Sequence, residues 1–122
     1  MRIPFIFLTT VILVFGATNL NAEPTPRNIT YTDPDEIYQI DQLYEKASAL
    51  VKKKDFRGAI RLYQEILFIE PDDETAYTNI GHSYMILGDT AKAKDAFLNA
   101  LHINPENEVA KLGIQKIVDP DS

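Results

Sequence analysis

Residues 76–105 read AYTNIGHSYMILGDTAKAKDAFLNALHINP, and residues 42–71 read QLYEKASALVKKKDFRGAIRLYQEILFIEP. The two stretches are copies of one sequence repeat, because a shift of 34 residues aligns identical residues at several positions. The identical pairs are Asp55 and Asp89, Ala59 and Ala93, Leu67 and Leu101, Ile69 and Ile103, and Pro71 and Pro105. A period of this length indicates stacked helical hairpins.

Side-chain size also recurs with this period, since Leu43 aligns with Tyr77 and Ala47 with Gly81. Such an alternation of large, small and aromatic positions resembles the tetratricopeptide repeat family. The second copy supplies the family positions as Tyr77, Gly81, Tyr84, Ala93, Phe97, Ala100 and Pro105. The first copy departs at Ile66, where alanine is usual. The resemblance implies an all-α fold: two helical hairpins and a C-terminal capping helix in a short right-handed α-solenoid.

The chain divides into a leader, a linker and one helical domain. We expect the domain over residues 34–118, with the first repeat at 40–73, the second at 74–107, a capping helix at 107–118 and a tail at 119–122. Asp33 followed by Pro34 is a strong helix start, with the aspartate as N-cap. Lys46 stands where the second copy has Ile80. A lysine there favours an N-terminal end to the repeats, because no earlier hairpin then covers it.

Composition excludes several classes of function. The chain has 122 residues, enough for one small domain, and contains no cysteine. Disulfides, thiolate metal sites and a cysteine nucleophile are therefore excluded. Its net charge of −6 makes nucleic acid and anionic lipid poor partners for the surface as a whole.

The first 22 residues predict export. Arg2 precedes a strongly apolar run, residues 3–15, and residues 3–22 carry no charge. This is the arrangement of a secretory signal, with cleavage expected after Ala22. The alternatives are an uncleaved membrane anchor and a buried helix, since 20 uncharged residues approach the length of a bilayer span. We expect a periplasmic or secreted location, or else a membrane-anchored domain facing out of the cytoplasm, with residues 23–33 as a flexible linker.

The turn between the two helices of the first hairpin is basic. Lys54 occupies the place of Gly88 in the second copy, where a left-handed residue is expected to end the helix. The run Lys52 to Lys54 is either a solvated helix end or, with Arg57 and Arg61, a local patch for an acidic partner.

No catalytic, cofactor or metal site is predicted. His82 and His102 are the only histidines, they fall on different helices, and no phosphate-binding glycine loop is present. We therefore expect a non-enzymatic protein without a cofactor.

The resemblance implies protein binding in a groove lined by the first helix of each hairpin. In the repeat register that groove would present Asp41, Tyr44, Glu45, Ser48, Thr78, Asn79, His82, Met85, Leu112 and Lys116. The competing interpretation is an ordinary solvated face. Only Asn79 matches the lysine, asparagine and arginine clamp with which some family members hold C-terminal carboxylates, so that mode of recognition is not expected.

Two hypotheses for function follow. The first is an adaptor that binds a peptide or helix of a protein partner in an envelope or secreted assembly. The second is a self-associating structural subunit that stays tethered to the membrane by an uncleaved N-terminal segment. This second hypothesis includes homo-oligomerisation. Leu62 and Phe68 lie off the main buried stripe and are either buried against the start of the chain or part of an exposed patch. Together with Ile37 they are candidates for a self-association or partner patch.

Overall fold

The computed structural model describes residues 33–122, and these form helices and turns without a strand. The predicted export signal and residues 23–32 of the predicted linker lie outside the described residues. The helices are α2 (Pro34–Lys52), α3 (Phe56–Ile69), α4 (Glu74–Leu87), α5 (Thr90–Ile103) and α6 (Glu108–Val118). The all-α expectation is confirmed, and none of the helices in this part of the chain has the length and apolar character needed to cross a membrane.

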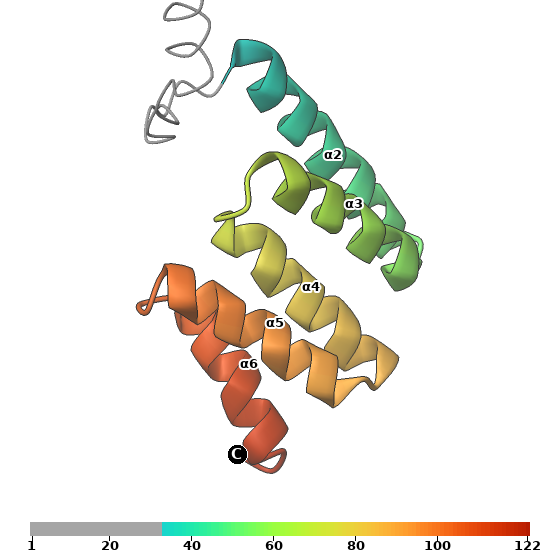
Figure 1. The fold of residues 1–122 in the computed structure, drawn as a ribbon. Helices are drawn as coiled ribbons and strands as arrows, with labels where there is room; N and C mark the ends of the chain where they lie inside the picture. Colours follow the sequence, from blue (N-terminus) through green and yellow to red (C-terminus); the bar gives the residue numbers. More distant parts are fainter. Residues whose placement is uncertain (1–32) are drawn as a thin grey trace, which may run out of the picture. The chain divides into compact units, whose positions relative to one another are not determined.

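The helices pack in chain order. α2 packs against α3, α3 against α4, α4 against α5, and α6 against both α5 and α4. Figure 1 shows this stack from the blue-green α2 to the red α6. Two antiparallel hairpins followed by a single helix therefore make up the unit.

Every helix in residues 33–122 begins at an Asp or Asn side chain that accepts a hydrogen bond from a backbone amide in the first turn. These N-caps are Asp33, Asp55, Asp73, Asp89 and Asn107. A cap satisfies an amide that has no partner inside the helix and is worth about 1 kcal/mol. The positions of these residues in the sequence therefore set the helix starts.

The two intra-hairpin turns have the same backbone geometry. Lys54 has φ 63° and Gly88 has φ 82°, so both lie in the left-handed region. The amides of Lys54 and Asp55 donate to Val51 and Leu50, and those of Gly88 and Asp89 donate to Met85 and Tyr84. The left-handed conformation predicted for Lys54 is confirmed, and it is strained because Lys54 carries a Cβ.

Lys54→Gly is expected to raise the free energy of unfolding by about 0.5–1 kcal/mol, because glycine adopts this conformation without a steric cost. Urea unfolding followed by circular dichroism measures the change. The matched control is Lys53→Gly, whose φ of −81° needs no glycine and which should give no gain. Equal effects of the two substitutions would contradict the assignment of strain to Lys54.

Two groups of buried side chains hold the helices together. The first joins α2, α3 and α4, with Ala96 of α5, around Leu43, Tyr63 and Ile66, and Ile66 has no exposed surface. The second joins α4, α5 and α6 around Phe97, which is also fully buried. Phe97 is the large side chain of this second core, whose other fully buried members are alanines.

The Phe97 ring lies between two helical glycines. A Cβ built on Gly81 of α4 would lie 2.6 Å from a ring carbon, and one built on Gly113 of α6 would lie 2.5 Å from two ring carbons. Both distances are far shorter than an ordinary van der Waals contact. Because glycine has no Cβ, α4 can pack closely on the ring at Gly81, and α6 can do so at Gly113.

A hydrogen bond at the end of each hairpin repeats with the period of the sequence. The Tyr44 hydroxyl donates to Asp73 Oδ2 at 2.7 Å, and Asn107 Nδ2 donates to Thr78 Oγ1 at 3.3 Å. Each bond joins the first helix of a hairpin to the N-cap of the helix that follows the hairpin. Burial raises the pKa of Tyr44 above its ordinary value, and the bond to Asp73 raises it further. These bonds help to fix the spacing of α2, α4 and α6.

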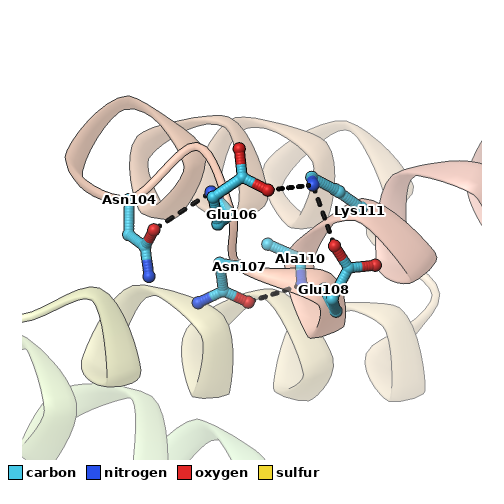
Figure 2. A network of polar contacts seen from close by, with 6 residues as sticks. All are labelled: Asn104, Glu106, Asn107, Glu108, Ala110 and Lys111. Carbon is cyan, nitrogen blue, oxygen red and sulfur yellow. Dashed lines mark hydrogen bonds and ion pairs between the residues drawn. The ribbon is translucent and has the colours of Figure 1, made fainter.

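The turn from α5 to α6 is organised by polar side chains (Figure 2). Asn104 Oδ1 accepts from the Glu106 amide at 3.0 Å, and Asn107 Oδ1 accepts from the Ala110 amide at 2.9 Å. Lys111 Nζ bridges Glu106 and Glu108 at 3.3 and 2.9 Å. The ion pairs are exposed and add little, so the two asparagines set the start of α6.

Candidate functional site

A series of hollows runs across α2, α4 and α6. A hollow beside α2 is lined by Tyr44, Glu45 and Ser48 and has a volume of about 420 Å³. Ser48 also lines a second hollow of about 210 Å³, which reaches Asn79, His82 and Ile86 of α4. His82 and Ile86 in turn line a third, of about 250 Å³, against α6. Because neighbouring hollows share residues, we call the series the groove.

The structure places most residues predicted for the groove in these hollows. Tyr44, Ser48, Asn79, His82, Met85, Leu112, Glu45 and Lys116 line them. Asp41 is exposed on α2 outside them. Thr78 is buried, with 8% of its surface exposed, and its hydroxyl donates to the Glu74 carbonyl at 2.8 Å. The Thr78 side chain serves packing between α4 and the turn before α6, because its oxygen also accepts from Asn107.

The third hollow is the apolar part of the groove. Ile86, Val109 and Leu112 line it and are 62%, 50% and 55% exposed. Three large apolar side chains that gather in one hollow and remain open to water are typical of a contact site. His82 and Lys116 lie in the same hollow and give it a polar, cationic edge.

His82 connects the second and third hollows. Its ring packs edge-on against Phe97, with ring centroids 5.2 Å apart, although the residue as a whole remains exposed. Burial of the imidazole lowers the pKa of His82 below 6.5, and the positive charge of Lys116 lowers it further. The neutral imidazole is therefore the form that the folded groove favours.

Stability is expected to fall as the pH is lowered through the range below 6.5, because the unfolded chain then binds a proton at His82 that the folded chain resists. Thermal midpoints at pH 7.5 and pH 5 measure the effect. In the His82→Gln variant this part of the pH dependence should disappear, whereas the contribution of the carboxylates remains. Identical pH profiles for the two proteins would contradict the lowered pKa.

Sequence reasoning missed Ile86 and did not place Val109 among the contact residues. The available signal was spacing, since Ile86 follows His82 by four residues and Val109 precedes Leu112 by three. Residues at these separations share a helix face. The predicted patch of Ile37, Leu62 and Phe68 is only partly exposed: Ile37 is 48% and Phe68 90% exposed, whereas Leu62 is half-buried against the first core.

Comparison with known proteins identifies the repeat. The family model described as tetratricopeptide repeat matches residues 75–107, which are α4, α5 and the turns that follow them. Residues 75–107 therefore match one tetratricopeptide repeat. The matched segment contains Gly81 and Phe97, and it supplies the α4 wall of the groove.

Two relatives are similar to this chain over most of its length. Sperm-associated antigen 1 of Rattus norvegicus is 32% identical over 116 residues, which cover 86% of this chain and 13% of the relative. Sperm-associated antigen 1 of Mus musculus is 35% identical over 92 residues, or 75% of this chain and 10% of the relative. Protein O-mannosyl-transferase TMTC3 of Homo sapiens is 29% identical over 58 residues, or 48% of this chain and 6% of the relative. The chain therefore spans only a small part of each relative.

Tetratricopeptide repeats are protein interaction modules, and their fold is generally a scaffold without catalytic activity. Among residues 33–122, no three His, Asp or Glu side chains are grouped so that they could hold a metal ion. The groove is a long, shallow contact surface. Its third hollow is apolar, and polar side chains contribute to the lining of the first and second hollows.

Proposed function

We propose that this chain is an exported adaptor whose groove binds a peptide or helix of a partner protein in an envelope or secreted assembly. The observation that carries the proposal is the exposure of Ile86, Val109 and Leu112 in one hollow beside Lys116. A partner helix with an apolar stripe would bury these side chains, which is the usual driving force of helix-in-groove recognition. Lys116 favours a partner with a carboxylate beside that stripe.

The polar part of the groove supports binding of an extended segment. Tyr44, Ser48 and Asn79 line the hollows next to the apolar one. The Ser48 hydroxyl and the Asn79 amide are donors and acceptors suited to a peptide backbone, whereas the Tyr44 hydroxyl donates its proton to Asp73 and is left as an acceptor. The partner is thus expected to place apolar side chains at the α4 and α6 end and backbone polar groups toward α2.

Site-specific photo-crosslinking in the native compartment tests the groove. A photoreactive residue is introduced in place of Ile86 or Val109, and in control variants in place of Glu65 or Lys94, which are exposed on α3 and α5. We expect one partner protein to be crosslinked from Ile86 and Val109 and not from the controls. Crosslinks of equal yield from Glu65 and Lys94 would contradict binding in the groove.

The proposal of export rests on residues 1–22. It is supported by the apolar, uncharged segment that follows Arg2. Fractionation of the producing cell, with N-terminal sequencing of the protein, tests it. We expect a chain outside the cytoplasm that begins near Glu23, and a cytoplasmic chain that retains residues 1–22 would contradict export.

The second candidate function is self-association as a structural subunit tethered to the membrane. The observation in its favour is Phe68, which is 90% exposed, together with Ile37 near the same end of the first hairpin. An aromatic side chain with so much solvent-exposed surface is a common anchor residue in protein–protein interfaces. Sedimentation velocity tests it: this candidate predicts a dimer or larger species that Phe68→Ser dissociates, and a wild-type monomer at high concentration would exclude it.

A further inference from the structure

A second cleft lies between α3 and the beginning of α5 and shares no lining residue with the groove. Its volume is about 620 Å³, which exceeds that of each hollow of the groove. Arg57 and Arg61 of α3 form one wall, and the segment from Gly88 to Lys92 forms the other. Ile60, which is 5% exposed, contributes to an apolar floor.

The cleft contains two arginines whose charges are not balanced by an ion pair within residues 33–122. Arg57 and Arg61 are four residues apart on α3 and therefore lie on the same face. Within residues 33–122, neither guanidinium has an ion-pair partner, although the chain has 18 acidic residues. Two unpaired arginines on an acidic protein make this cleft a local site of positive potential.

The opposite wall adds a third cation. Lys92 Nζ lies 2.9 Å from Asp89 Oδ2 and 5.4 Å from the centroid of the Tyr84 ring. The hydrogen bond to Asp89 raises the pKa of Lys92, and the charge of Arg57 acts in the opposite direction. Lys92 and Arg57 line the same cleft, so a ligand carboxylate bound there would be attracted by both charges.

The cleft continues as an apolar hollow. A neighbouring cavity of about 230 Å³ shares Gln64, Tyr84 and Lys92 with it and extends to Leu67 and Tyr77. Asp95 and Asn99 also line this cavity. Together the two cavities form a furrow between α3 and α5, with Arg57 and Arg61 at one end and Leu67 and Tyr77, beside Asp95, at the other. The furrow is far larger than a single phosphate or carboxylate, so its occupant is a chain segment with both acidic and apolar side chains.

We propose that this furrow binds an acidic peptide segment of a partner protein, with carboxylates on Arg57 and Arg61 and an apolar side chain against Leu67 and Tyr77. Arginine suits this role because its planar guanidinium binds a carboxylate through two parallel hydrogen bonds. Since the furrow and the groove share no residue, the chain can hold two partner segments at once.

Fluorescence anisotropy with the full chain and a labelled peptide of repeated Glu-Glu-Leu tests the proposal. We expect saturable binding that weakens with salt, and loss of binding when glutamine replaces each glutamate of the peptide. Arg57→Gln with Arg61→Gln should weaken binding at least about tenfold. The matched control is Lys46→Gln with Lys94→Gln, which removes the same charge at exposed positions outside the furrow and should leave binding within about twofold.

Several results would overturn the proposal. No saturable binding by the wild-type chain is one, and equal weakening in the two double variants is another, because it would show general charge attraction. Displacement of the peptide by inorganic phosphate at equal concentration would show a simple anion site. Leu112 lines the groove and not the furrow. If Leu112→Asp weakened peptide binding as much as the double arginine variant does, the peptide would bind in the groove instead. Circular dichroism of each variant checks that the fold is intact.

Discussion

Phe97→Ala is expected to lower the free energy of unfolding by about 3–5 kcal/mol. Phe97 has no exposed surface, and the fully buried residues around it are Ala93, Ala100 and Ala110. Small neighbours on helical backbones collapse poorly into the space of a lost ring, so most of the cavity remains. A domain of this size has a total stability of about 5–10 kcal/mol, so the loss is a large fraction of it.

Urea unfolding followed by circular dichroism measures this effect. The matched control is Leu98→Ala, because Leu98 is the next residue of α5 and is 47% exposed. We expect a change of less than about 0.5 kcal/mol for Leu98→Ala. Similar losses for the two variants would show that Phe97 does not hold the second core. Because α6 packs on this core, the Phe97 variant should also lose hydrogen-exchange protection in α6 before α2.

Gly113→Val is expected to destabilise the chain by about 1–3 kcal/mol through overpacking. The Cβ at position 113 would lie 2.5 Å from two carbons of the Phe97 ring, and the buried ring has no free space to move into. α6 must then shift away from α5, which moves Val109 and Leu112 relative to α4. The variant should therefore lose partner binding as well as stability.

A double-mutant cycle isolates the contact with the ring. In a Phe97→Leu background the side chain at position 97 is smaller, so the cost of Gly113→Val should fall by more than about 0.5 kcal/mol. Gln115→Val, at an exposed position of α6, measures the cost of valine in the helix without that contact. The same cost of Gly113→Val in both backgrounds would contradict the role of Gly113 as the point of close approach.

The local features of the fold were predictable because they depend on neighbouring residues. The N-caps at Asp33 and Asp55 follow from the chemistry of the first helical turn. The left-handed turn at Lys54 follows from its alignment with Gly88. The small residue at position 81 follows from the repeat, and the contact of Gly81 with Phe97 shows its physical reason.

The site was harder to predict because it depends on packing between helices. Periodicity placed Thr78 on the groove face, but its hydrogen-bond donor Asn107 lies 29 residues away in sequence and is not visible in that pattern. Periodicity likewise treated Leu62 and Phe68 alike, whereas Leu62 packs on the first core and Phe68 is exposed. The sequence predicted a basic patch of Lys52 to Lys54 with Arg57 and Arg61. Of these residues the two arginines line the furrow, and their proximity to Lys92 depends on the spatial arrangement of α3 and α5.

The most direct test of the groove is the affinity of the chain for the partner that is crosslinked from it. Isothermal titration compares the wild type with Ile86→Asp and Leu112→Asp in the groove and with Leu98→Asp, an exposed apolar position on α5. We expect the two groove variants to bind at least about tenfold more weakly and Leu98→Asp to remain within about twofold of the wild type. Unchanged affinity in Ile86→Asp and Leu112→Asp, or an equal loss in Leu98→Asp, would contradict binding of the partner in the groove.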